Sequence, residues 1–355
     1  MSTATAVDEG RMQAFMGKML DDMSAAMSGA LVLIGDKLGL YRAIAEHGPL
    51  TAQQLAERTG TKERYVREWL AAQAASDYVT YDAKSGRFSM SPEQAMALAR
   101  EDSPVFVAGA FDIIAAAYMD EPKVRQVFRT GGGVGWHEHS QCLFQGTERF
   151  FRTSYAAHLV QEWLPALEGV VAKLEKGAKV ADVGCGHGAS TILMARAFPN
   201  ARFFGFDYHD GSIGRARKAA EASGLGNLHF DVASAKAFRG SNYDLITAFD
   251  CLHDMGDPVG AARRIHEALA PDGTFMLVEP FARDRLADNL NPVGRIYYSA
   301  STMICTPASL SQEVGLALGA QAGEARLRGV LEEAGFTRIR RAAETPFNMI
   351  LEARP

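Results

Sequence analysis

The residues best placed to do chemistry are three glycines and two acids in one short stretch of chain. The run VADVGCGHGAS puts Asp182 at the end of an apolar segment and Gly184, Gly186 and Gly188 directly after it. Glycines are needed in such a turn because a Cβ would block close approach of a ligand to the backbone. Asp207 ends the next apolar segment, 25 positions after Asp182 (207 − 182). A carboxylate there accepts hydrogen bonds from ribose hydroxyls, so the pattern predicts a nucleoside site.

The spacing of the glycines separates two kinds of nucleoside ligand. The pattern is G-x-G-x-G, whereas dinucleotide folds use G-x-G-x-x-G to hold a pyrophosphate at a helix N-terminus. S-adenosylmethionine has no phosphate. Its sulfonium and ammonium groups suit the acidic Asp182, and its carboxylate suits the amides of the glycine loop. A nicotinamide-dependent oxidoreductase is therefore disfavoured.

The elements that position these residues are apolar runs that alternate with helical stretches from Lys179 onward. The predicted strands are 180–183, 202–206, 228–230, 243–249 and 274–278. This alternation predicts an α/β domain with a parallel sheet covered by helices on both faces. Two further runs, 336–340 and 347–352, are joined by a link too short for a parallel crossover, so the last strand should run antiparallel.

The N-terminal part is predicted to be mainly helical. Apolar residues recur at helical spacing from Met12 to about Ala45, which favours one long helix. Its Met- and Leu-rich face fits either a partner subunit in a homodimer or an ordinary core. The apolar stretches 25–40 and 105–119 are both too short to span a membrane and are interrupted by charged residues, so we expect buried helices.

Residues 49–90 have the pattern of a winged helix. Thr51 and Gln54 form a capping box, Gly60 ends that helix, and Thr61 is expected to cap the next one. A hairpin follows, with strands at 78–81 and 87–90. A winged helix can bind DNA, or it can serve only for packing and dimerisation.

Charge on the second of these helices bears on DNA binding. Lys62, Arg64 and Arg67 would face phosphate, but Glu63 and Glu68 on the same helix leave it nearly neutral. Phosphate affinity needs a surplus of basic residues, so packing is favoured.

Composition places the chain among cytoplasmic globular proteins. It has 355 residues, a net charge of −5 and four scattered cysteines without CxxC spacing, which predicts neither nucleic-acid affinity nor a disulfide framework. The breaker run GGGVG at 131–135 marks a seam. We expect a helical domain at 1–135 and a ligand-binding domain at 176–355 with an inserted lid at 281–325. A connector at 136–175, mostly helical from about Arg149 to Glu175, should contribute to the substrate pocket.

Over about residues 176–280 the chain resembles class I S-adenosylmethionine-dependent methyltransferases, whose Rossmann-like sheet has seven strands. With its winged-helix front it resembles dimeric small-molecule O-methyltransferases and, nearly end to end, an actinobacterial group of methyltransferases labelled as transcriptional regulators. The expected cofactor residues are Asp182, Gly184, Cys185, Gly186, Gly188, Asp207, Tyr208, Ser234, Ala235 and Asp250.

One departure from the family concerns adenine. Such enzymes usually offer an Asp to the adenine amino group after the third strand, but the run DVASA has Ser234 at that place. Either Ser234 and the amide of Ala235 serve instead, or Asp231 reaches across.

The resemblance also implies catalytic residues. In AFDCLHDMGDP, residues 248–258, His253 matches the general base of the LHDW segment in dimeric O-methyltransferases, although Met255 replaces the Trp. Glu279 matches the carboxylate that orients this base, and Asp254 flanks it. The alternative is that His253 only ties down a loop.

The acceptor pocket is predicted from two segments. The first is Trp136-His137-Glu138-His139, whose two histidines and one acid have no further paired metal ligand nearby. We therefore expect this segment to line the pocket or to contact the other domain, without a metal. The segment 291–325 shows few helix or strand signals at its start and is read as a lid or a packing subdomain. It contributes Tyr297, Tyr298 and Met303 to a largely apolar pocket.

These features predict a methyltransferase acting on a small, partly apolar acceptor, most readily on oxygen. N- or S-methylation is the nearest alternative, because such acceptors need positioning more than a base. A regulator that binds DNA and senses S-adenosylmethionine is the alternative from another class.

Overall fold

The computed structural model describes residues 7–355 and divides into two compact units, 1–115 and 116–355, each with its own apolar core. The division falls inside a helix, α6 (Ala110–Thr130). Among the described residues no single helix meets the length and hydropathy of a membrane span; α1 and α2 meet that test only jointly, with a bend of 66° between them.

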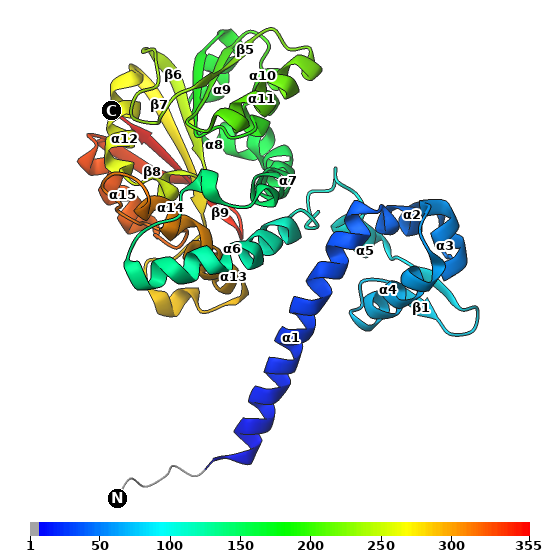
Figure 1. Ribbon diagram of the computed structural model, residues 1–355. Helices are drawn as coiled ribbons and strands as arrows, with labels where there is room; N and C mark the ends of the chain where they lie inside the picture. The colour runs from blue at the N-terminus through cyan, green and yellow to red at the C-terminus, as the bar shows by residue number, and fades with distance from the viewer. Residues whose placement is uncertain (1–6) are drawn as a thin grey trace, which may run out of the picture. The chain divides into compact units, whose positions relative to one another are not determined.

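The first unit is a winged helix preceded by a long helix. Its elements are α1 (Glu9–Lys37), α2 (Leu40–His47), α3 (Ala52–Thr59), α4 (Glu63–Ala75), β1 (Thr80–Asp82), β2 (Arg87–Ser89) and α5 (Pro92–Leu98) (Figure 1). The predicted hairpin is confirmed, and Leu50 pairs with Phe88 to extend it by one bridge. The capping box of Thr51 and Gln54 is present. Lys62, not Thr61, occupies the N-cap position of α4.

The predicted single helix from Met12 to Ala45 is wrong. It breaks at Gly39, whose φ of +69° lies in the left-handed region where a side chain is strained. The prediction that 25–40 and 105–119 are buried is also only partly right: Val32 is buried, but Ile34, Tyr118 and Met119 are exposed.

One face of α1 is apolar and exposed. It consists of Met12, Phe15, Met16, Met19, Leu20, Met23 and Met27. These residues recur every three or four positions, so they lie on one side of the helix.

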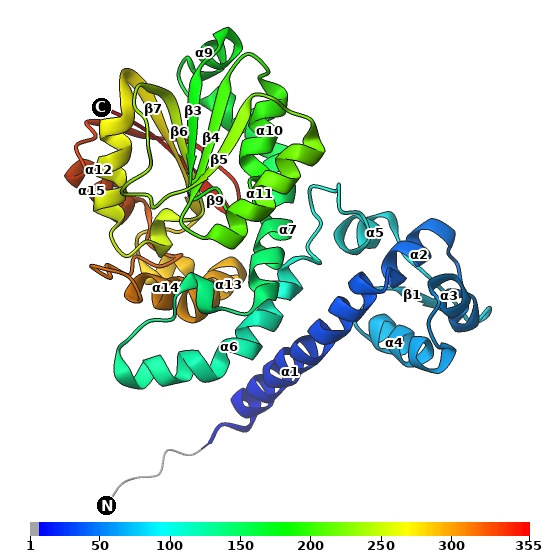
Figure 2. The same ribbon diagram turned by 45° about the horizontal axis from the view of Figure 1, so that its top comes forward.

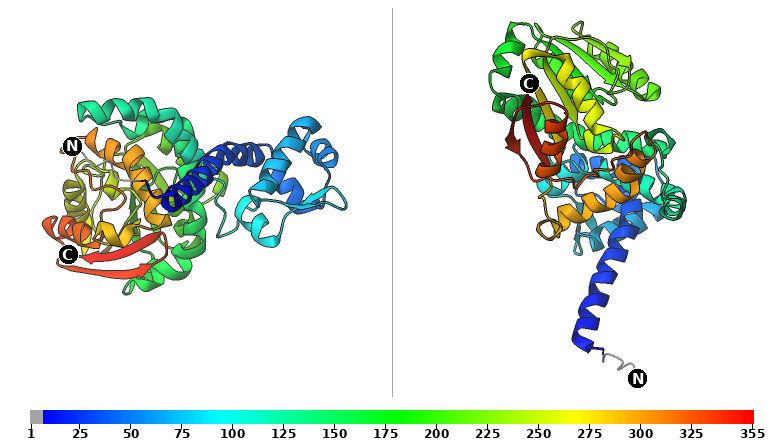
Figure 3. Two further views of the ribbon diagram at one scale, coloured as in Figure 1. Left: turned by 90° about the horizontal axis from the view of Figure 1, so that it is seen from below. Right: turned by 90° about the vertical axis from the view of Figure 1, so that its left-hand side faces the viewer.

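The second unit holds a seven-stranded sheet. Its strands are β3 (Lys179–Val183), β4 (Arg202–Asp207), β5 (Leu228–Val232), β6 (Tyr243–Phe249), β7 (Leu269–Pro280), β8 (Arg338–Glu344) and β9 (Asn348–Arg354), in the order β5-β4-β3-β6-β7-β9-β8. The strands β3 to β7 are mutually parallel, and β9 is antiparallel to both of its neighbours, as predicted. Figure 3 shows β8 and β9 side by side at one edge.

Alternation along the strands builds a core on each face of the sheet. On β7, Phe275 and Leu277 face one core, and Met276 and Val278 face the other. The first core is completed by α12 (Pro258–Ala268) and α15 (Glu324–Glu333). The second is completed by α9 (Val170–Lys176) and α10 (Ala189–Ala197). Figure 2 shows α12 and α10 on opposite sides of the strands.

Further helices complete this unit. They are η1 (Trp136–Glu138), α7 (Gln141–His158), η2 (Leu159–Trp163), α8 (Leu164–Ala166), α11 (Asp210–Ser223), η3 (Leu252–Asp254), η4 (Leu286–Asn289), α13 (Pro292–Ala300), η5 (Ser301–Cys305) and α14 (Thr306–Leu310). The helix predicted from about Arg149 therefore begins eight residues earlier, at Gln141 (149 − 141). The start of the 291–325 segment, predicted to carry few helix signals, is helical, because Asn291 caps α13 and Pro292 occupies its first turn.

Candidate cofactor and active site

A cavity of about 400 Å³ opens where β3, β4 and β6 end. Ten predicted residues line it: Trp136, Gly184, Cys185, Gly186, Asp207, Tyr208, Ser234, Ala235, Asp250 and Asp254. Carboxyl ends of parallel strands meet at one edge of a sheet, which is why strand-end residues up to 70 positions apart (254 − 184) converge there. A volume of this size suits a nucleoside-sized ligand.

The three glycines of the loop after β3 have different surroundings. A Cβ on Gly184 would lie 2.6 Å from the Sγ of Cys251, and one on Gly188 would lie 2.5 Å from the ring of Phe230. A Cβ on Gly186 would meet no protein atom within 4 Å, although its φ is +52°. Packing within the protein therefore requires the two outer glycines, while Gly186 presents bare backbone to the cavity.

Asp182 lies beneath this loop and not on the cavity wall. Its carboxylate accepts hydrogen bonds from the hydroxyls of Ser190 (2.7 Å), Thr191 (2.6 Å) and Thr247 (3.0 Å). Burial raises the pKa of Asp182, against the effect of these three donors. In this arrangement the side chain fastens the loop to α10 and β6.

Asp207 lies at the end of β4 on the cavity wall. One oxygen accepts the amide of Gly186 at 3.0 Å, and the other accepts the amide of His209 at 2.8 Å. Burial raises its pKa, and the two amides oppose this rise. Each carboxylate oxygen keeps a lone pair, so Asp207 has capacity for two further donors.

Asp250 follows β6 and has a φ of +49°, an unusual conformation for a residue with a side chain. Its carboxylate accepts hydrogen bonds from the hydroxyl of Tyr155 (2.9 Å) and the amide of Asn348 (2.8 Å). Burial, together with the charge of Glu279, raises the pKa of Asp250 to about 8. The cavity thus has a carboxyl group that titrates close to neutrality.

The predicted adenine end is lined by Ser234 and Ala235. Asp231 is not among the described residues that line the cavity. Its carboxylate contacts His229 (3.1 Å) and Arg217 (3.6 Å) instead. The geometry favours the first of the two alternatives for adenine.

Sequence reasoning missed the aromatic wall that α7 contributes. Phe144, Phe151 and Tyr155 line the cavity. Phe144 also stacks on His209, with ring centroids 5.1 Å apart. The signal was present, because steps of seven and four residues place these side chains on one helix face.

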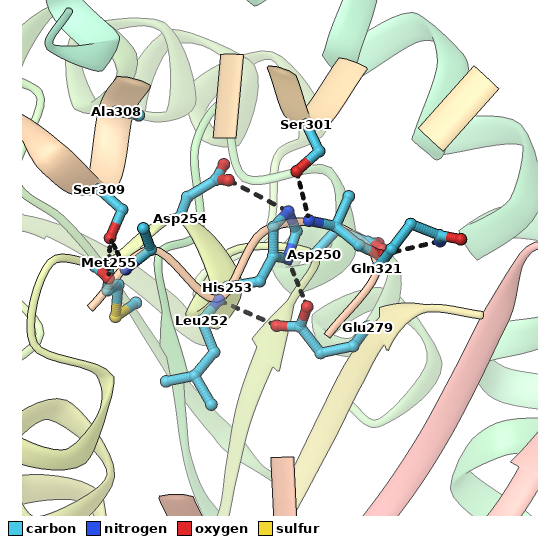
Figure 4. A network of polar contacts seen from close by, with 12 residues as sticks. Asp250, Leu252, His253, Asp254, Met255, Glu279, Ser301, Ala308, Ser309 and Gln321 are labelled. Carbon is cyan, nitrogen blue, oxygen red and sulfur yellow. Dashed lines mark hydrogen bonds and ion pairs between the residues drawn. The ribbon is translucent and has the colours of Figure 1, made fainter. Parts of the chain in front are cut away.

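His253 lies between two carboxylates (Figure 4). Its Nδ1 is hydrogen-bonded to Glu279, and its Nε2 lies 3.1 Å from Asp254. Burial alone would lower the pKa of His253, but Asp254 and Glu279 outweigh it and raise that pKa well above the ordinary value. His253 and Glu279 are buried, whereas Asp254 reaches the cavity wall. The side chains of Glu279, His253 and Asp254 thus follow one another from the interior to the cavity. The thiol of Cys305 lies close to them, with its Sγ within 4.8 Å of a ring nitrogen of His253 and of a carboxylate oxygen of Asp254.

The other predicted pocket residues do not reach the described wall of this cavity. His137 is exposed, and Tyr297 is buried with its hydroxyl donating to the carbonyl of Phe347. His139 is buried against Asp120, and Tyr298 and Met303 lie on α13 and η5 outside the wall.

Two family models match parts of the chain. Residues 174–335 match a methyltransferase domain, and residues 26–100 match an Rv2258c-like winged HTH domain.

Curated relatives match over shorter stretches. The ubiquinone biosynthesis O-methyltransferase of Actinobacillus pleuropneumoniae is 34% identical over 105 residues, 28% of this chain and 44% of that protein. The trans-aconitate 2-methyltransferase of Streptomyces avermitilis is 30% identical over 128 residues, 36% of this chain and 48% of that protein. The chain therefore spans less than half the length of these relatives.

Solved structures match over nearly the whole chain. The mitomycin 7-O-methyltransferase MmcR has a TM-score of 0.70 at 19% identity, covering 98% of this chain and 100% of that one. Human N-acetylserotonin methyltransferase, in complex with SAM, has a TM-score of 0.70 at 16% identity, covering 99% of each chain. At these identities the likeness concerns the fold. Together with the two family models, it shows that the chain carries a winged helix-turn-helix domain followed by a methyltransferase domain of the class I fold.

Proposed function

We propose that this protein is an S-adenosylmethionine-dependent methyltransferase that methylates a small, partly apolar acceptor on oxygen. One observation carries the proposal: the cavity joins bare loop backbone at Gly186 and the free acceptor capacity of Asp207 to an aromatic wall on α7. The methyltransferase domain match supports the reaction class.

The residues present fit this cofactor. Gly186, which faces the cavity without a Cβ, leaves space for the ligand, and Asp207 suits the ribose hydroxyls. Ser234 and the amide of Ala235 suit the adenine edge. Asp250 suits the ammonium of the methionine part of the cofactor, because this acid lines the cavity close to the glycine loop. Its neighbour Cys251 packs against Gly184 of that loop. When bound, the cofactor supplies an activated methyl group.

Glu279, His253 and Asp254 are proposed to act together in the reaction, with Asp254 as the one that contacts the acceptor. His253 in its charged form donates a hydrogen bond to Glu279 and forms an ion pair with Asp254, which favours one orientation of Asp254 at the cavity wall. Asp254 then contacts the acceptor and holds it in line for displacement, a step that depends mainly on orientation. Glu279 and His253 act as positioning residues in this proposal.

The acceptor is proposed to bind between the aromatic wall and Asp254. Trp136 from the proposed connector 136–175, together with Phe144 and Phe151, supplies flat apolar surface. The insertion 281–325 adds Ala308 and Gln312 to the wall, in keeping with a lid. Oxygen is preferred over nitrogen or sulfur because MmcR and other neighbours of this fold are O-methyltransferases by name.

A homodimer through α1 is proposed as the working assembly. The exposed apolar face of α1 supports it, since a helix in water does not favour seven large apolar side chains on one side without a partner.

Two experiments test the function. Calorimetry should detect binding of S-adenosylhomocysteine and no binding of NAD. The protein is then incubated with methyl-labelled cofactor and a metabolite extract of the host cell, and the labelled product is identified by mass spectrometry. A folded protein without affinity for S-adenosylhomocysteine would exclude the proposal.

A further inference from the structure

A second histidine lies beside the cavity in an arrangement that the proposed reaction has not yet used. His139 is buried, and its Nδ1 lies 3.1 Å from an oxygen of Asp120. Asp120 also accepts the amide of Ser140 (2.8 Å), the hydroxyl of Ser140 (2.8 Å) and the ammonium of Lys123 (3.0 Å). These donors hold the pKa of Asp120 at about 2, although burial opposes them. Asp120 is therefore a fixed, ionised acceptor.

The other ring nitrogen of His139 is buried and has no hydrogen-bond partner within the described chain. An ionised Asp120 at Nδ1 favours the tautomer with a proton on that nitrogen. The lone pair then lies on Nε2. A buried polar atom without a partner costs free energy, so such an atom calls for a ligand or a water molecule.

Two residues locate His139 at the cavity margin. Its ring centroid is 6.5 Å from that of Trp136, which lines the cavity. Asp254, which also lines the cavity, is close enough for its charge to affect the pKa of His139. His139 therefore lies behind the cavity wall, near the indole of Trp136 and within electrostatic range of Asp254.

The protonation states of the two histidines differ. Burial, helped by the charge of Lys123, lowers the pKa of His139 and outweighs the opposing effect of Asp120 and Asp254. Close to neutral pH the imidazole of His139 is neutral, whereas His253 is charged, with Nδ1 hydrogen-bonded to Glu279 and Nε2 paired with Asp254. A base needs a nitrogen with a free lone pair, and Nε2 of His139 has no partner within the described chain, whereas both nitrogens of His253 face carboxylates.

We propose that His139, oriented by Asp120, is the catalytic base that selects a hydroxyl-bearing acceptor. This inference rests on the proposed function. The acceptor hydroxyl donates to Nε2 of His139, its O–H bond breaks, and the proton passes to that nitrogen. The oxygen lone pair forms the new C–O bond as the methyl–sulfur bond breaks, and the electron pair of that bond stays on sulfur.

The test uses the full chain saturated with S-adenosylhomocysteine and phenol as the probe hydroxyl. Nitrogen NMR of the histidine rings should show His139 neutral at pH 7.5 with Nε2 unprotonated, and phenol should shift the Nε2 resonance. His139→Gln should weaken phenol binding about tenfold without changing the affinity for S-adenosylhomocysteine. The matched control is His137→Gln, since His137 is an exposed histidine two residues away.

The outcomes separate the two proposals. A protonated Nε2 at pH 7.5, an Nε2 resonance unmoved by phenol, or equal phenol affinity in both variants overturns the role of His139. Absence of S-adenosylhomocysteine binding by the unaltered protein overturns the proposed function instead. Asp120→Asn gives a second check, because loss of its charge should lower the pKa of His139 further while leaving the ring in place.

Discussion

The hydroxyl of Tyr155 on α7 donates a 2.9 Å hydrogen bond to Asp250, which lies 95 positions away at the end of β6. This bond joins the helix that forms the aromatic wall to the strand end that carries the acid. Asn348 donates to the other oxygen, so the carboxyl group is held from two sides. Its position is therefore set before any ligand enters.

The raised pKa of Asp250, about 8, makes both stability and ligand affinity depend on pH. Because the folded pKa lies above the unfolded value, this group stabilises the fold below about pH 4, and that contribution is lost as pH rises through about 8. The loss is at most about 1.4 kcal/mol per pH unit. Asp250→Asn should remove this dependence and raise the melting temperature of the ligand-free protein at pH 8.

Affinity should move in the opposite direction from stability. If Asp250 receives the ammonium of the cofactor, calorimetry should show tighter S-adenosylhomocysteine binding between pH 7 and 9 in the unaltered protein. Asp250→Asn should bind more weakly and show a flat profile over that range. A variant that keeps the original affinity at every pH would place the ammonium elsewhere.

Gly186→Ala tests whether the loop backbone faces the ligand. Its φ of +52° strains any side chain, at a cost of about 1 kcal/mol, but no protein atom obstructs the new methyl group. Gly224→Ala is the matched control, since Gly224 has a φ of +67°, equal space around it, and a position at the end of α11 outside the cavity wall. Both variants should lose similar stability on urea unfolding. Only Gly186→Ala should lose S-adenosylhomocysteine affinity, by tenfold or more.

Glu279→Gln tests the charge on His253. A raised folded pKa means that His253 stabilises the protein below pH 6.5 and that this contribution is lost as pH rises through the folded value. In an Asp250→Asn background, which removes the titration of Asp250 near pH 8, urea unfolding at pH 6, 7.5 and 9 should show falling stability. Adding Glu279→Gln should flatten that fall. An unchanged slope would mean that Glu279 does not hold the charged form of His253.

Met23→Glu tests the proposed dimer. A charge in the middle of the exposed apolar face of α1 should shift the protein to monomers in sedimentation analysis. Ala14→Glu is the control, because helical spacing places Ala14 on the opposite side of α1. A protein that is monomeric before substitution would remove the proposal at once.

The winged helix is expected not to bind DNA. On α4, Arg64 pairs with Glu68 at 2.6 Å and Arg67 with Glu63 at 2.7 Å, which leaves little basic surplus. Fluorescence anisotropy with a 30-base-pair duplex should show no binding at 50 mM salt. Salt-dependent binding that Lys62→Ala, Arg64→Ala and Arg67→Ala abolish would support the regulator hypothesis instead.

The sequence was most informative where local chemistry decides structure. The glycine loop, the strand ends at Asp207 and Asp250, and the antiparallel β9 could all be read from spacing and link length. The break of the first helix at Gly39 was missed, because one glycine within an apolar period is weak evidence against continuation.

The site was less predictable where tertiary contacts decide it. An acid such as Asp182 is expected to contact the ligand. Its carboxylate instead accepts hydrogen bonds from three hydroxyls of α10 and β6 beneath the loop. The pairing of His139 with Asp120 joins the residue that follows η1 to α6 across 19 positions, and no periodicity in the sequence predicts it.

The reversed direction of β9 has a consequence for biosynthesis. Because β9 runs opposite to β7, its first residue, Asn348, lies at the edge where the parallel strands end, and there it holds Asp250. A ribosome delivers this strand after every other strand of the sheet. Nascent chains that have completed β3 to β8 thus lack one of the two donors to Asp250, and this side of the binding site is completed only when β9 has been synthesised.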